Sequence, residues 1–150
     1  MDPSLATQCL QGALDQMISK ARSLSAADLI RQPLGDDTNS VGALVFHCSN
    51  VVEFWLGHVA LGRESTRDRD TEFVWAGQLA ELETAVAAAR TQVGNDVEAM
   101  AAIGSECPHE LRGVLFGAQD DEALLTYVII ELYQHLGHID ITIDALKRLP

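Results

Sequence analysis

The strongest constraint on the fold of this chain is the spacing of its apolar residues, which recur at helical intervals over four long segments. We expect helices at residues 3–23, 40–62, 77–103 and 121–148, and Pro3 suits the first turn of the earliest one. Patterns typical of β-strands are scarce. The sequence therefore predicts an all-α fold, and an antiparallel four-helix bundle is the simplest arrangement of four long helices with apolar faces.

The ends of the expected helices carry residues that favour helix termini. Either Asn39 or Ser40 is placed to cap the second helix, and either Asp120 or Asp121 the fourth. The fourth helix also begins acidic and ends at the basic residues 147–148, as the helix dipole favours. These signals locate the start of a helix more sharply than periodicity alone.

Two polar stretches are expected to be loops. The first, residues 62–73, holds a run of alternating charges that forms an arginine clamp for an anionic substrate or pairs within itself, and its balanced charge favours internal pairing. The second, residues 104–117, contains Pro108 and three glycines, so we expect His109 to lie in an exposed loop.

The composition is that of a soluble globular protein, because 47% of the 150 residues are hydrophobic and 21% are charged. This length suits one domain over residues 1–150. The formal net charge of -12 speaks against nucleic-acid binding, because affinity for phosphate backbones comes from basic side chains, and against adsorption to anionic membranes. No apolar run approaches the roughly 20 residues that span a bilayer.

The cysteines indicate a reducing compartment. Cys9, Cys48 and Cys107 are odd in number and widely spaced, which argues against a disulfide framework and against a four-cysteine zinc site. Each is expected to be a small buried apolar side chain. Because the N-terminus also lacks the basic and apolar blocks of a signal peptide, we expect a cytoplasmic protein.

The residues that can carry chemistry lie in the fourth helix. Glu131 and His135 are four residues apart, so they share a helix face, and His138 stays near that face. Apolar residues surround them, and burying a carboxylate and two imidazoles is unfavourable unless they bind something or pair with one another. This helix alone leaves two interpretations open, a hydrogen-bonded carboxylate–histidine cluster and a set of metal ligands.

A histidine in the second helix favours the metal. His47 also faces an interior, and although a lone histidine there is more often a core residue, with Glu131 and His135 it completes two imidazoles and one carboxylate. This set suits zinc, nickel or iron(II), and three protein ligands leave a position for water or a substrate atom. His58 lies roughly 16 Å further along the helix axis, so we expect it at a pocket rim or on the surface.

These motifs resemble the DinB-like superfamily of metal-binding four-helix bundles, which includes the mycothiol-dependent maleylpyruvate isomerase and bacillithiol transferases. The resemblance rests on His47 and on the segment Glu131-Leu-Tyr-Gln-His135-Leu-Gly-His138, and it covers essentially the whole chain. It implies an up-down-down-up bundle, often a homodimer, in which His47, Glu131 and His135 bind a divalent metal at one end. The activities of the superfamily imply transfer or isomerisation reactions in which the metal activates a low-molecular-weight thiol.

We therefore expect a divalent-metal-dependent enzyme that acts on a small molecule, as a thiol-dependent S-transferase or isomerase or as a hydrolase, with zinc as the favoured metal. Asn50 and His138 are candidates to orient the ligating imidazoles or to line the pocket. The alternative is a non-catalytic metal-binding or interaction bundle. A third interpretation is a bundle without metal, in which Glu131 and the histidines form a polar network.

Overall fold

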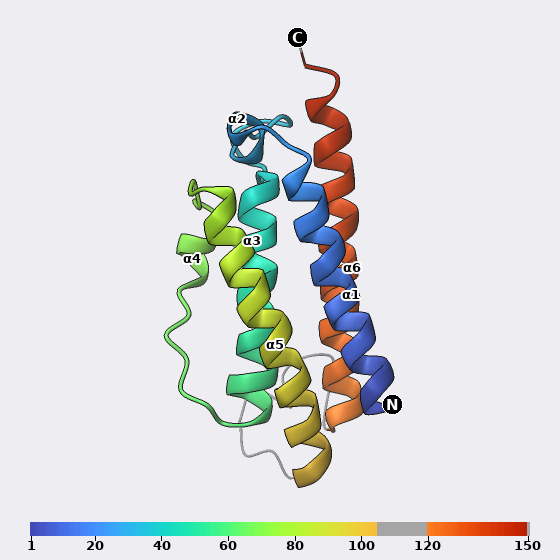
Figure 1. Cartoon of the computed structure of the whole chain (residues 1–150). Coiled ribbons are helices and arrows are strands. Elements are labelled where there is room, and N and C mark those ends of the chain that lie inside the picture. Colours follow the sequence, from blue (N-terminus) through green and yellow to red (C-terminus); the bar gives the residue numbers. More distant parts are fainter. Residues whose placement is uncertain (105–119, 150) are drawn as a thin grey trace.

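The chain folds into long helices that lie side by side (Figure 1). The structure is a computed structural model and describes residues 1–104 and 120–149. Its elements are α1 (Pro3–Arg22), α2 (Ala26–Leu29), α3 (Val41–Val52), the π-helix η1 (Glu53–Ala60), α4 (Arg69–Glu72), α5 (Leu79–Ile103) and α6 (Asp121–Leu146). The described residues contain no strand, which confirms the all-α prediction. Cys107, His109 and nearly all of the loop expected at residues 104–117 lie outside the described residues.

The long helices begin where side chains accept hydrogen bonds from backbone amides that have no helical partner. Asp2, Ser40 and Asp120 each accept one from the N–H three residues later, at 3.1, 3.1 and 2.8 Å. A cap of this kind stabilises a helix by about 1 kcal/mol. The predicted starts of the first, second and fourth long helices are thereby confirmed, whereas α5 begins at Leu79 without a side-chain cap.

The four longest helices enclose the core. In Figure 1, α1 and α6 run in one direction and α3 and α5 run in the other. Helix α1 packs against α5, α6 and α3, and α3 also packs against α5 and α6. Among the described helices, none is long and apolar enough to cross a membrane. The largest fully buried apolar side chains include Leu10, Leu14, Met17, Leu56, Leu82, Met100, Leu124, Leu132 and Ile139.

The second long helix changes its winding at Glu53. The apolar spacing predicted one helix as far as residue 62, whereas α3 passes into the π-helix η1, which ends at Ala60. The chain then folds back, and the Arg63 N–H donates to the carbonyl of Gly57 at 2.9 Å. The Arg63 guanidinium lies against Gly57, where any Cβ would clash with it. A glycine at this position therefore leaves the room in which the Arg63 side chain crosses the helix.

The charged segment after η1 is tied to buried carboxylates. Arg63 makes two hydrogen bonds to Asp96 of α5, at 3.0 and 2.6 Å, and Arg67 makes two to Glu72 of α4, at 2.7 and 2.9 Å. Asp96 lies outside the polar stretch 62–73, so the expectation of internal pairing is wrong for Arg63, whereas Glu72 lies inside it and Arg67 pairs as expected. The physical reason is burial, because a carboxylate removed from water needs a charged or hydrogen-bonding partner.

The segment that follows α4 packs back onto α3. Trp75 lies against Gly42, where a Cβ would clash with the indole ring. Phe73 contacts His47, with their ring centroids 4.6 Å apart. These contacts hold the neighbouring Glu72 beside α3, at the level of His47.

Candidate metal centre

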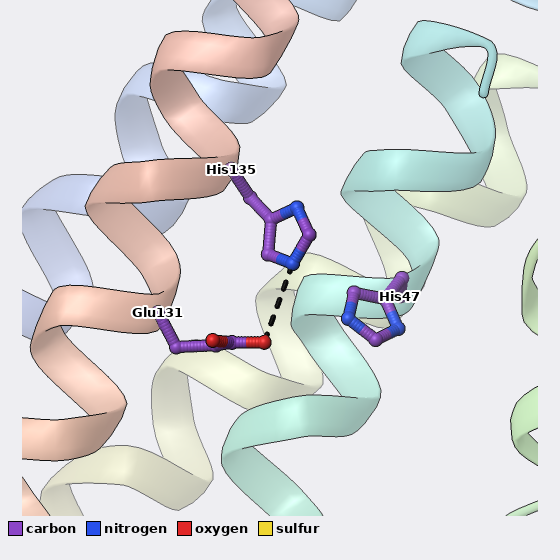
Figure 2. A group of neighbouring side chains, drawn as sticks. All are labelled: His47, Glu131 and His135. Atoms are coloured by element: carbon purple, nitrogen blue, oxygen red, sulfur yellow. Dashed lines mark ion pairs between the residues drawn. The ribbon is translucent and has the colours of Figure 1, made fainter. Parts of the chain in front are cut away.

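Three polar side chains meet between α3 and α6 (Figure 2). Glu131 and His135 project from successive turns of α6, and His47 projects from α3. One potential ligand atom from each residue lies within 4.8 Å of the others. The Oε1 atom of Glu131 is 3.4 Å from Nε2 of His135, and the rings of His47 and His135 have centroids 4.8 Å apart. The structure thus brings together the three residues that the sequence singled out.

The group is buried on the α3 side and partly open on the α6 side. His47 is 3% exposed, whereas the side chains of His135 and Glu131 keep 16% and 25% of their accessible surface. A cavity of about 640 Å³ adjoins Glu131, and its lining includes Tyr127 and Ile130. The carboxylate side of the group therefore borders a space large enough for a small molecule.

His47 is held by a buried carboxylate that sequence reasoning missed. Its Nδ1 atom lies 2.7 Å from Oε2 of Glu72, and Arg67 donates hydrogen bonds to both oxygens of the same carboxylate. With Nδ1 engaged, Nε2 is the ring nitrogen that remains to bind an ion. Histidines that bind metals usually donate the other ring N–H to a carboxylate, a backbone carbonyl or a water, and Glu72 is such a partner.

The sequence holds only a weak signal for Glu72. The residue comes 25 positions after His47, at the end of a stretch whose charges suggest a solvated loop. The apolar residues 73–75 directly after it are the one sign that the chain returns to the core there. A requirement for a carboxylate partner at His47 points to no particular acidic residue among the several in this stretch.

The electrostatic surroundings favour a neutral imidazole beside ionised carboxylates. Burial lowers the pKa of His47, against the opposing effect of its hydrogen bond with Glu72. Burial alone would raise the pKa of Glu72, but hydrogen bonds from Arg67 and His47 outweigh it and hold that pKa below its ordinary value. The neighbouring His135 lowers the pKa of Glu131. These directions favour a neutral His47 beside ionised Glu72 and Glu131, and neutral imidazole and ionised carboxylate are the forms that bind a metal.

The donor set fits a divalent metal ion. Two imidazoles and a carboxylate suit zinc, nickel or iron(II), and zinc lies about 2.0–2.2 Å from such ligands. In the described part of the chain, Nδ1 of His135 is the one buried side-chain nitrogen or oxygen without a hydrogen-bond partner. A buried unpaired ring nitrogen is unfavourable. This atom lies on the far side of the ring from Nε2, which faces Glu131, so the support for a metal ion comes from the donor set and not from Nδ1 (Figure 2).

The two residues predicted to orient the ligands do not bond to them. The Asn50 amide donates to the carbonyl of Phe46 at 3.1 Å, as polar side chains within a helix often do, and it lines a separate cavity beside Arg67. His138 is exposed, and its ring centroid lies 5.4 Å from that of His135. The hydrogen-bond partner of His47 is Glu72, and the roles of Asn50 and His138 stay predictions.

His58, Cys48 and Cys9 lie outside the group formed by His47, Glu131 and His135. His58 is half-buried rather than at the surface, and its Nδ1 atom lies 2.6 Å from the carbonyl oxygen of Arg63. Cys48 is fully buried, as predicted, and burial strongly raises the pKa of its thiol. Cys9 is only partly buried. These positions give no reason to count any of the three among the metal ligands.

Comparison with known proteins assigns the chain to a family. The sequence pattern of the mycothiol-S-transferase family matches residues 6–146. The chain therefore belongs to this family, which is DinB-like, and the resemblance to the DinB-like superfamily is confirmed. Neither the curated proteins nor the solved structures provide a significant match.

Proposed function

We propose that this member of the mycothiol-S-transferase family is a metal-dependent thiol S-transferase in which His47, Glu131 and His135 hold a divalent metal ion. In this proposal the protein joins the sulfur of a low-molecular-weight thiol to a small electrophilic molecule. The observation that carries the proposal is the approach of the three potential ligand atoms to within 4.8 Å of one another.

The contacts around these residues support the same assignment. Glu72 occupies Nδ1 of His47, which leaves Nε2 for an ion, and Glu131 and His135 face it from one side of α6. A divalent ion held there would lower the pKa of a bound thiol and so supply thiolate near neutral pH. Three protein ligands leave an open position for that thiol.

The proposed reaction forms one carbon–sulfur bond. The thiol gives up its proton to water, the sulfur attacks an electrophilic carbon, and the bond from that carbon to the leaving group breaks with its electron pair. We place the small molecule in the cavity beside Glu131, where Tyr127 and Ile130 offer apolar surface and Gln134 offers an amide. Closeness of this cavity to the ligands would bring the two reactants together.

Metal content tests the ligand assignment. We expect the purified, untagged protein to contain about one zinc, nickel or iron ion per chain, and His135→Ala to lose it. His138→Ala is the matched control, because it removes an exposed imidazole from the same helix and should keep the metal. If the unaltered chain binds no metal after reconstitution at neutral pH, the proposed site is wrong.

Thiol consumption tests the reaction. The metal-loaded protein is mixed with mycothiol and a chromogenic electrophile such as a chlorodinitrobenzene, and formation of the thioether is followed by absorbance. We expect turnover to require the thiol and the metal, and to be lost in His47→Ala. A protein that binds metal but turns over neither thiols nor hydrolysable esters would instead be a non-catalytic metal-binding bundle, and the enzymatic proposal would fail.

Several finer expectations remain predictions. We propose that α1, α5, α6 and the continuous pair of α3 and η1 form a DinB-like four-helix bundle, and that residues 1–150 form one domain. We further propose zinc as the ion, a cytoplasmic location, and a homodimer that binds a small molecule and neither nucleic acid nor membranes. Light scattering of the purified protein tests the dimer directly.

A further inference from the structure

We infer that Glu72 and Arg67 are positioning residues for His47, in which Glu72 selects the imidazole tautomer that leaves Nε2 free to bind the metal and Arg67 holds Glu72 in place. The inference rests on the proposed metal site and goes beyond it, because it assigns a function to the segment that follows η1. Two groups of opposite charge, the Glu72 carboxylate and the Arg67 guanidinium, meet at one ring nitrogen of His47.

Nδ1 of His47 lies between an acceptor and a donor. The Oε2 atom of Glu72 is 2.7 Å away, and an ionised carboxylate can only accept a hydrogen bond. The Nη2 atom of Arg67 is 3.4 Å away, and a guanidinium can only donate. The shorter contact is the one to the carboxylate. Nδ1 therefore carries the proton, and this N–H donates a hydrogen bond to Glu72.

The choice of tautomer decides whether His47 can bind a metal. A neutral imidazole carries one proton, so a proton on Nδ1 leaves a lone pair on Nε2. Without the carboxylate, Arg67 would be the remaining partner of Nδ1, and it would favour the opposite tautomer with the proton on Nε2. Glu72 thus does more than restrain the ring, because its loss would let the neighbouring arginine block the ligand atom.

The carboxylate is itself fixed by several contacts. Arg67 donates from Nε to Oε1 and from Nη2 to Oε2, at 2.7 and 2.9 Å, which gives the pair a two-point geometry. The guanidinium also lies over the ring of Phe54, 5.2 Å from its centroid, and Phe73 packs on the ring of His47. Glu72 and His47 are almost completely buried, so these hydrogen bonds form away from competing water.

The test is the zinc affinity of Glu72→Gln, measured by competition with a chromogenic chelator. This variant keeps the shape of the side chain and removes its charge. We expect zinc to bind about 10–100-fold more weakly, the range typical for loss of a carboxylate partner of a ligating histidine. In the zinc-free protein, a proton–nitrogen correlation spectrum should show the His47 proton on Nδ1, and Glu72→Gln should move it to Nε2.

Asp96→Asn is the matched control. Asp96 is also a buried carboxylate that receives two hydrogen bonds from an arginine of the same segment, but its described contacts are with Arg63 and Gln92 rather than with a histidine. We expect this variant to lose stability while its zinc affinity and the tautomer of His47 stay unchanged. A general loosening of the segment would instead weaken zinc binding in both variants, and that result would overturn the inference.

A double variant keeps the test decisive if Glu72→Gln does not fold. Combining Glu72→Gln with Arg67→Met removes both the carboxylate and the competing donor, and it leaves no unpaired guanidinium. We expect its zinc affinity to lie between those of Glu72→Gln and the unaltered chain, or, if the single variant cannot be isolated, below that of the unaltered chain. Zinc affinity equal to that of the unaltered chain in either variant would overturn the inference. If the unaltered chain itself binds no zinc, the proposed function is wrong. The tautomer measurement still tests the role of Glu72, because a His47 proton that stays on the same nitrogen in Glu72→Gln would overturn the inference.

Discussion

The pairs Arg63–Asp96 and Arg67–Glu72 have similar geometry but connect the segment after η1 to different parts of the molecule. Arg63 and Arg67 each make two hydrogen bonds to a carboxylate that is almost fully buried. The carboxylate of Asp96 belongs to α5, so the first pair ties the segment to a long helix. The Oε2 atom of Glu72, one of the two oxygens that accept from Arg67, also contacts His47, so the second pair ends on a proposed ligand.

The kind of interaction does not by itself reveal the function of either pair. Both pairs have similar distances and similar carboxylate burial, and neither would stand out in a survey of ion pairs. The difference lies in the third group, which is a glutamine amide at Asp96 and an imidazole at Glu72. The exposure of the arginines also differs, because the Arg67 side chain is 11% exposed and that of Arg63 is 37% exposed. These differences can be tested by breaking each pair separately.

The largest effect on stability is expected when each carboxylate is removed. Glu72→Ala leaves Arg67 with little access to water, so we expect the free energy of unfolding to fall by about 3–5 kcal/mol. Asp96→Ala leaves Arg63 partly solvated, and the loss should be about 1–2 kcal/mol. Urea denaturation of both variants measures the difference. Equal losses would mean that the exposure of the arginine does not set the cost of breaking the pair.

A smaller effect on stability is expected at Gly57 and Gly42, the two glycines against which Arg63 and Trp75 pack. Gly57→Ala would push the Arg63 guanidinium away, and Gly42→Ala would push Trp75 away from α3. Each should destabilise the fold by about 1–3 kcal/mol, the usual range for overpacking. Only Gly42→Ala should also weaken zinc binding, because Trp75 holds Glu72 beside His47.

Gly137→Ala is the control for these glycine substitutions. An added Cβ at this position of α6 meets nothing within 4 Å. We expect the substitution to leave zinc binding unchanged and to stabilise the helix by up to about 1 kcal/mol, because alanine has the higher helix propensity. Loss of stability in Gly137→Ala would show that backbone changes alone, rather than the predicted clashes, explain the other two variants.

The smallest effect is a change in the reactivity of Cys48. Its thiol is fully buried and its pKa is strongly raised, mainly by burial, so a thiol reagent should label it only when the structure opens. In a chain whose other cysteines are replaced by serine, we expect Glu72→Gln to speed labelling more than Asp96→Asn does. Mass spectrometry of timed samples measures the two rates. Faster labelling in Asp96→Asn would show that the Arg63–Asp96 pair, rather than the Arg67–Glu72 pair, does more to keep the structure around Cys48 closed.

Most of the helices could be predicted because their signals are local. The caps at Ser40 and Asp120 and the proline at position 3 act within one turn of the helix that they start, and the apolar spacing acts over the length of a single helix. The pairing of Glu131 with His135 could be predicted equally well, because residues four apart in a helix lie one turn apart on the same face. Bringing His47 to them required one further inference, that its helix faces theirs.

The features that were missed depend on contacts between distant parts of the chain. Arg63 reaches Asp96 across 33 positions, and Glu72 reaches His47 across 25. Nothing in the sequence says which acidic residue each arginine will meet, since the same segment offers several. The change from α3 to η1 was missed for a related reason, because apolar residues at helical intervals do not distinguish one helical winding from another.

The position of the proposed ligands along the chain has a consequence for the order in which the protein can mature. Glu131 and His135 lie in α6, which the ribosome makes after α1, α3 and α5. The earlier helices leave the ribosome first and can begin to associate before α6 is made. The group in Figure 2, however, can assemble only once α6 has left the ribosome and docked against α3. Until then the nascent chain offers His47 alone, and the proposed metal site is incomplete.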